Sequence, residues 1–121
     1  IDEGRLNLGS RLMPYASYCI EFVNSIRASY EETRSVAIDM GILKDDEVEV
    51  LFSINAAGKI EFESVTKDSI RQQENFRTKC IMAVQYAAPV SPPPYELMRD
   101  EGQNGKIYIP FKFMFKNIRY R

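Results

Sequence analysis

The first half of the chain opens with a helical pattern of apolar residues. Between Tyr15 and Tyr30, large apolar side chains recur every three or four residues, which places them on one face of a helix. Pro14 suits the first position of this helix, because the N–H donor that proline lacks would have no helical partner there. We therefore predict a helix over about Tyr15–Ser35, with a continuation toward Ala37.

The period of the apolar pattern then falls to two. Valine, phenylalanine and isoleucine alternate with other residues along Val48–Ile54, and the alternation resumes along Lys59–Val65. Such alternation is typical of half-buried β-strands. The intervening Asn55–Gly58 favours a tight turn, because glycine readily adopts a positive φ. The two strands are therefore predicted to form an antiparallel hairpin.

A second helical pattern follows the hairpin. Asp68 or Ser69 is placed to cap this helix, with Gln72 or Gln73 positioned to reach back. The residues predicted to form its buried stripe are Phe76, Cys80, Ala83, Val84 and Ala87. Those expected to lie largely outside the stripe are Arg71, Asn75, Lys79 and Gln85.

Prolines determine where this second helix ends. Pro89 lacks a backbone donor and disfavours helical geometry at the preceding residue, so the helix must stop near Ala87 or Ala88. Pro92–Pro94 then hold the backbone near polyproline II. Pro92–Tyr95 also matches a short proline-rich ligand pattern, but we favour a rigid connector because the prolines directly follow a helix stop.

The region after the prolines contains a polar segment and a final strand. The segment Glu96–Gly105 is polar and contains two glycines, which predicts a mobile loop, whereas Lys106–Lys116 alternates strictly. Pro110 is tolerated in this strand if its missing donor faces outward from a sheet edge. The element order α-β-β-α-β predicts an α+β fold with a three-stranded antiparallel sheet in the order 2-1-3. Two helices are expected on its phenylalanine-rich face, and Lys112 is expected opposite Glu49.

Composition indicates a single globular domain. The 121 residues are 45% hydrophobic and 27% charged, and we divide them into a lead-in segment, 1–13, and a domain, 14–121. The net charge of −1 gives no electrostatic footprint for nucleic acid or an anionic membrane. The apolar runs fall short of the roughly 18 residues that span a bilayer. A membrane anchor could nevertheless precede Ile1 in a longer protein.

The residue types argue against an enzyme, a metal site or a cofactor. Histidine, the commonest general base and metal ligand, is absent. The acidic residues before and at the start of the first predicted strand have no nucleophile or base beside them, and we interpret them as a solvated turn. They are Asp45, Asp46, Glu47 and Glu49. We therefore predict no catalytic residues.

Two cysteines, Cys19 and Cys80, lie on the predicted buried stripes of the two helices. They could form one disulfide, which would imply an oxidising compartment and would close a loop of about sixty residues. The alternative is two buried free thiols that pack as small hydrophobes, and we favour that alternative.

Three stretches together resemble the C-terminal periplasmic domains of TonB and TolA energy-transducing proteins. They are the hairpin Val48–Ile60, the helix end with prolines Ala83–Pro94, and the final strand Ile107–Phe113. With the first helix, they cover nearly everything from Tyr15 to Phe115. The resemblance implies a periplasmic domain of an inner-membrane-anchored protein that transmits force or links the envelope. It also implies that an outer-membrane or periplasmic partner engages the final strand.

The final strand is the candidate binding site on physical grounds as well. A long edge strand offers free backbone donors and acceptors, to which an extended peptide from a partner protein can add as a further strand. The residues predicted to contact the partner are Tyr108, Pro110, Lys112, Met114 and Asn117. Alternatively, the N-terminal segment or a second copy of the chain covers this edge. The alternative function is a structural self-assembly domain of a cell-envelope or motor complex, a homodimer that also uses the outward Leu51.

Overall fold

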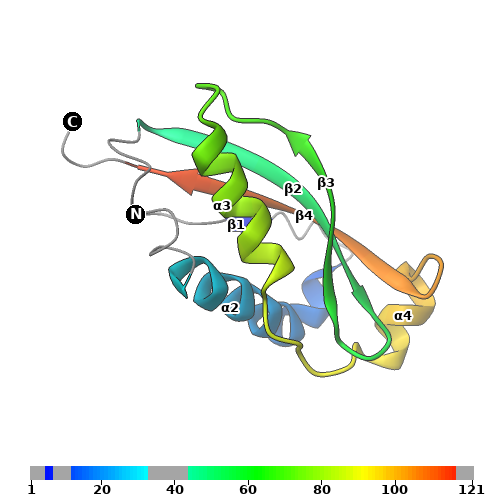
Figure 1. Ribbon diagram of the computed structural model, residues 1–121. Helices are drawn as coiled ribbons and strands as arrows, with labels where there is room; N and C mark the ends of the chain where they lie inside the picture. Colours follow the sequence, from blue (N-terminus) through cyan, green and yellow to red (C-terminus); the bar gives the residue numbers. More distant parts are fainter. Residues whose placement is uncertain (1–4, 7–11, 33–43, 117–121) are drawn as a thin grey trace.

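The structure is a computed structural model that describes residues 5–6, 12–32 and 44–116 (Figure 1). A short 3-10 helix, Met13–Tyr15, leads directly into the first long helix. The helices are α2 (Ala16–Glu32), α3 (Glu74–Gln85) and α4 (Tyr95–Glu101). The strands are β1 (Arg5–Leu6), β2 (Asp46–Asn55), β3 (Ile60–Lys67) and β4 (Lys106–Phe115).

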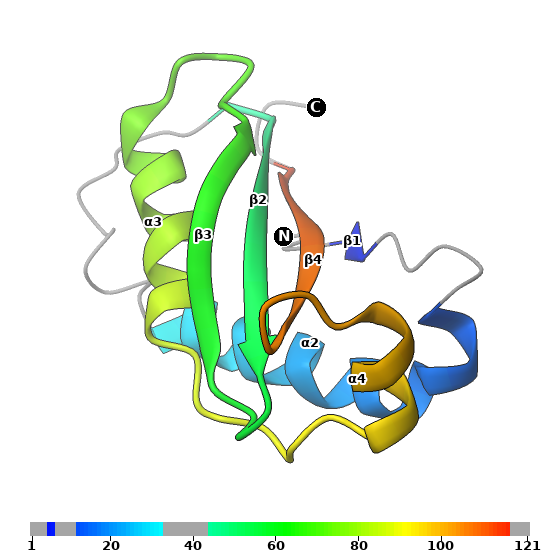
Figure 2. The ribbon, with the colours of Figure 1, turned by 90° about the vertical axis from the view of Figure 1, so that its right-hand side faces the viewer.

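The strands form one antiparallel sheet in the order β1-β4-β2-β3, and Figure 2 shows the four strands side by side in this order. Its three long strands have the predicted order 2-1-3, so the predicted α+β fold is confirmed. The ladder between β2 and β4 runs without a register shift through ten pairs, from Asp46↔Phe115 to Asn55↔Lys106. Lys112 lies opposite Glu49, as expected. The two-residue strand β1 is an addition to the three predicted strands.

Helices α2 and α3 cover one face of the sheet (Figures 1 and 2). This is the phenylalanine-rich face, as predicted, because the odd-numbered residues of β4 and the even-numbered residues of β2 point toward the helices. Phe52 lies at the centre, with ring centroids 5.6 Å from Phe22 of α2 and 6.2 Å from Phe111 of β4. Burial of such aromatic side chains supplies most of the driving force that holds the layers together.

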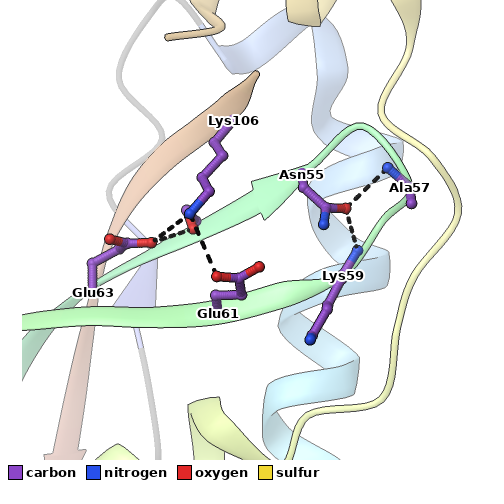
Figure 3. A network of polar contacts seen from close by, with 7 residues as sticks. Asn55, Ala57, Lys59, Glu61, Glu63 and Lys106 are labelled. Atoms are coloured by element: carbon purple, nitrogen blue, oxygen red, sulfur yellow. Dashed lines mark hydrogen bonds and ion pairs between the residues drawn. The ribbon is translucent and has the colours of Figure 1, made fainter. Parts of the chain in front are cut away.

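The hairpin turn is built by Asn55 and Gly58. The Asn55 side-chain oxygen accepts hydrogen bonds from the backbone N–H groups of Ala57 and Lys59, at 2.9 and 3.0 Å (Figure 3). Gly58 has a φ of +87°, and its carbonyl accepts a 2.9 Å bond from the N–H of Val90. A side chain at position 58 would overlap the Val90 carbonyl. The turn therefore serves as the docking point for the crossover from α3 to α4.

The helix boundaries differ from the prediction at several ends. Helix α3 begins at Glu74, later than a cap at Asp68 or Ser69 would place it, because Gln72 has a positive φ of 56° that interrupts helical geometry. Ser69 nevertheless accepts a bond from the N–H of Gln73. Helix α3 ends at Gln85, just before the predicted stop, and the predicted continuation of α2 over residues 33–37 lies outside the described residues.

Two residue-level expectations were wrong. The segment after the prolines is not a loop throughout, because Leu97 is 1% exposed and anchors helix α4 in the core. Lys79 does not lie outside the buried stripe of α3, since it is 6% exposed. Its ammonium nitrogen lies 3.9 Å from the ring centroid of Tyr30 on α2, a cation–π contact that compensates for part of the lost hydration.

Candidate partner-binding edge

The backbone direction of β4 follows from the hydrogen bonds at its first residue. The N–H and C=O groups of Lys106 both bond to Gln103, at 3.0 and 2.7 Å. Those of Asn55, which lies opposite Lys106, bond instead within the hairpin, to Lys59 and Gly58. Lys106 therefore turns its backbone groups away from β2. Because backbone groups alternate sides along a strand, every second residue of β4 does the same.

The residues of β4 whose backbone groups face the outer edge include four of the predicted partner-binding residues. Tyr108, Lys112 and Met114 direct both an N–H and a C=O to the outer edge, and Pro110 directs only a C=O. Pro110 thus lacks a donor only where β2 does not need one, which explains why the ladder with β2 is unbroken. The structure brings these four residues together along one edge, and Asn117 lies outside the described residues.

The side chains of the same four residues lie on the open face of the sheet and are all partly buried. Leu51 of β2 lies directly opposite Pro110 and is also partly buried. Lys112 lies directly opposite Glu49, but its ammonium group forms a 3.3 Å ion pair with Glu47, the diagonal neighbour on β2. Tyr108, Pro110 and Leu51 therefore form an apolar strip on the open face, bordered at one end by the Lys112–Glu47 ion pair.

A polar network borders the other end of this strip (Figure 3). Lys106 lies 3.4 Å from a carboxylate oxygen of Glu61 and 3.5 Å from one of Glu63. The fully buried Ser53 hydroxyl donates a 2.6 Å bond to Glu63. That bond, assisted by Lys106, lowers the pKa of Glu63, and the bond to Glu61 raises the pKa of Lys106. The register of β2 with β3 and β4 brings these residues together on the open face.

Strand β1 covers the centre of the β4 edge. Arg5 lies opposite Lys112 and Leu6 lies opposite Phe111, in antiparallel register. Among the described residues, β1 is the only strand that pairs with this edge. The N-terminal segment therefore covers the β4 edge at two residues, Phe111 and Lys112, as the alternative prediction expected.

The proline-rich connector is packed against the domain. The Ser91 N–H and hydroxyl donate to the Glu21 carboxylate at 2.7 and 2.8 Å, and the Tyr18 hydroxyl donates to the Ser91 carbonyl at 2.8 Å. Pro93 is buried, although Tyr95 is 74% exposed. Recognition of the proline-rich ligand pattern needs both residues accessible, so the arrangement agrees with the interpretation as a rigid connector.

The acidic residues that were interpreted as a solvated turn belong to strand β2 from Asp46 onward, and they do not all lie in solvent, so that interpretation was wrong. Asp46 is 6% exposed, and its carboxylate accepts hydrogen bonds from the Ser69 hydroxyl, the Gln73 side chain and the Ile70 N–H. Burial by itself would raise the pKa of Asp46, but these bonds, led by that from Ser69, lower it below its usual value. Asp46 is thus a structural link between β2 and the segment before α3.

Cys19 and Cys80 are both buried in the core and both are free thiols. The structure therefore contains the favoured arrangement and not the disulfide. Burial raises the pKa of each thiol, most strongly at Cys80. Neither is placed as a reactive nucleophile, because the thiolate is the reactive form.

The described residues offer no other site of this kind. They contain no cluster of His, Cys, Asp and Glu side chains able to hold a metal ion. No helix within residues 12–32 or 44–116 is long and apolar enough to cross a membrane. No protein-family model, curated protein or solved structure matches the chain. The resemblance to TonB and TolA domains stays a prediction.

Proposed function

We propose that this chain is a protein-binding domain of a TonB- or TolA-like energy-transducing or envelope-linking protein. In this proposal it lies in the periplasm as part of an inner-membrane-anchored protein. It engages an outer-membrane or periplasmic protein by adding an extended segment of that partner to the outer edge of β4. The task requires binding and mechanical integrity, and the proposal assigns no catalysis and no cofactor.

The observation that carries the proposal is the outer edge of β4. Three residues, Tyr108, Lys112 and Met114, direct donor and acceptor pairs to this edge, with the Pro110 carbonyl between them. Main-chain bonds of this kind supply affinity in strand addition, and neighbouring side chains supply selectivity. Tyr108, Met114 and the adjoining Leu51 provide partly buried apolar contacts for that purpose.

The remainder of the fold supports a mechanical task. The ten-pair ladder joins β4 to β2, and the buried odd-numbered residues of β4 fix the strand to the core. A load applied to β4 is therefore shared by many hydrogen bonds and by the apolar layer beneath. The long elements follow the order α2-β2-β3-α3-β4 that the sequence pattern predicts, with both long helices on one face of the sheet (Figure 1).

Peptide binding at single-residue resolution tests the proposal. Extended peptides copied from periplasm-exposed segments of outer-membrane proteins would be titrated into the ¹⁵N-labelled chain. We expect saturable shifts of the Tyr108, Lys112 and Met114 amides. Met114→Pro removes an edge donor, whereas Met114→Ala trims the side chain and keeps that donor. Binding should fall at least fivefold more for Met114→Pro than for Met114→Ala, the effect of about one main-chain hydrogen bond.

Two results would contradict strand addition. One is a set of shifts confined to β3 or to the helical face, with β4 unaffected. The other is equal binding by Met114→Pro and Met114→Ala, which would show that the edge donor is not used. Tyr108→Glu adds a charge beside the edge, and unchanged binding by this variant would also argue against the proposed contact surface.

The alternative function, self-assembly, is favoured by one observation. Leu51 and Pro110 form an apolar cross-strand pair on the open face. A second copy of the chain could cover this pair. Sedimentation over a concentration range separates the two functions, because the transducer proposal predicts a monomer and self-assembly predicts a stable dimer.

A further inference from the structure

Strand β1 occupies the same backbone groups that strand addition would use. Lys112 turns its N–H and C=O outward, and Arg5 lies directly opposite Lys112. Arg5 and Lys112 are therefore the hydrogen-bonded pair of this short ladder. Leu6 lies opposite Phe111, whose backbone groups face β2, so Leu6 directs its own groups away from β4.

The two ladders of β4 differ greatly in length. On the inner side, β4 pairs with β2 through ten residues. On the outer side, β1 is a strand of two residues. A short extended segment has little pairing to offset its loss of conformational freedom, so it detaches far more readily than a strand in the sheet centre. A longer segment that also paired with Tyr108 and Met114 would gain contacts that β1 does not make.

We propose that β1 is a displaceable internal occupant of the β4 edge, and that a partner segment binds only after Arg5–Leu6 has left Lys112 and Phe111. This inference rests on the proposed function and adds a regulatory step to it. The apparent affinity of the partner is then the intrinsic affinity multiplied by the fraction of molecules in which β1 is detached. Whatever weakens β1 strengthens partner binding, and whatever fixes β1 in place abolishes it.

Two proline substitutions in the full chain provide a matched pair. Arg5→Pro removes the donor that faces Lys112, whereas Leu6→Pro removes a donor that points away from β4. Leu6→Pro also keeps the preceding residue in extended geometry, which suits a strand. Any general effect of proline on the N-terminal segment is common to both variants, and only Arg5→Pro weakens the pairing with β4.

Hydrogen-exchange rates of the β4 amides measure the detachment of β1 directly. We expect the Lys112 amide to exchange at least tenfold faster than the Phe111 and Phe113 amides, which face β2, after correction for intrinsic rates. Arg5→Pro should accelerate exchange at Lys112 further, and Leu6→Pro should not. A Lys112 amide as protected as its two neighbours would overturn the proposal.

The binding affinity of a defined probe measures the competition between β1 and an added strand for the β4 edge. The probe is a labelled synthetic peptide with the sequence of residues 1–11, which supplies β1 in trans. It should bind Arg5→Pro about fivefold more tightly than it binds the natural chain or Leu6→Pro, the effect of roughly one backbone hydrogen bond. In the double variant Arg5→Cys/Lys112→Cys, an oxidised cross-link should abolish binding, and reduction of the same sample should restore it.

The outcomes separate the two proposals. Equal probe affinity for the natural chain, Arg5→Pro and the oxidised double variant would overturn the displacement mechanism and leave strand addition standing. No probe binding to Arg5→Pro, when its Lys112 amide exchanges rapidly, would contradict strand addition at β4 itself. Concentration-dependent dimers that exchange β1 between copies would also contradict the proposal, because β1 would then pair with β4 of another copy.

Discussion

The buried carboxylate of Asp46 offers the sharpest test of how the sheet is joined to α3. Its Oδ1 accepts from the N–H groups of Glu47 and Ile70, at 2.8 and 2.9 Å. Its Oδ2 accepts from the Ser69 hydroxyl and from Gln73 Nε2. In Asp46→Asn, one oxygen can keep the two backbone bonds. The new amide group then faces the Gln73 Nε2 donor without an acceptor, and the Ser69 oxygen, which already accepts from the Gln73 N–H, can offer it only a neutral bond through its second lone pair.

The size of the effect follows from the bonds that are lost. Two hydrogen bonds to a charged acceptor are removed, each with a net contribution of about 1.5–3 kcal/mol. Gln73 lies partly in solvent and also donates to the Lys44 carbonyl, which reduces its share of the loss. We therefore expect Asp46→Asn to lower the free energy of unfolding by about 2–4 kcal/mol at pH 7. The matched control Glu74→Gln changes a side chain that is 85% exposed, and should change stability by less than about 0.5 kcal/mol.

Urea denaturation at several pH values measures both the size and the charge dependence of this effect. The folded-state pKa of Asp46 is lowered, so its stabilisation is present above the unfolded-state pKa of about 3.9. That stabilisation is lost as the pH falls through the folded pKa. The difference between Asp46→Asn and the natural chain should therefore shrink in acid. A difference below about 0.5 kcal/mol at pH 7, or one that stays constant into acid, would refute the reasoning.

Three further predictions concern the crossover, the thiols and the oligomeric state. Gly58→Ala should destabilise the fold by more than about 1–2 kcal/mol in thermal or urea unfolding, because it combines a positive φ with overlap on Val90. Denatured, non-reduced protein should titrate two thiols, whereas native Cys19 and Cys80 should react slowly because burial raises their pKa. Sedimentation should give a monomer, and a stable dimer would favour self-assembly.

Strands β2 and β4 were predictable because apolar residues recur at every second position along them. Each of β2 and β4 buries every second residue, so the face on which each side chain lies follows from the sequence. Pro110 also indicates which residues of this strand direct their backbone groups to the edge, because a proline in an otherwise regular strand must turn its nitrogen away from the neighbouring strand. Alternation and this proline together were therefore enough to place four of the five candidate site residues on one edge, and Asn117 lies outside the described residues.

The features that the pattern missed depend on contacts between distant segments. Lys79 is buried because the packing of α2 against α3 places Tyr30 beneath its ammonium group, and no period in the sequence reports that packing. Helix α4 has seven residues, of which Leu97 is buried and Met98 packs partly buried against the core, and so short a segment gives no periodic signal. Strand β1 is shorter still, and its two residues form a strand only because β4 is beside them.

The difference in length between the β2–β4 ladder and the β1–β4 ladder also bears on how the domain could carry force. A partner strand pulled along its own axis would load its hydrogen bonds to β4 together, and β4 would pass that load to β2 through ten pairs. Phe111 and Phe113 add buried anchors beneath β4. Strand β1 has two paired residues, so the displacement proposal expects it to detach while β4 stays paired with β2. β4 is therefore suited to remain in the sheet under load, and β1 to leave it when a longer strand arrives.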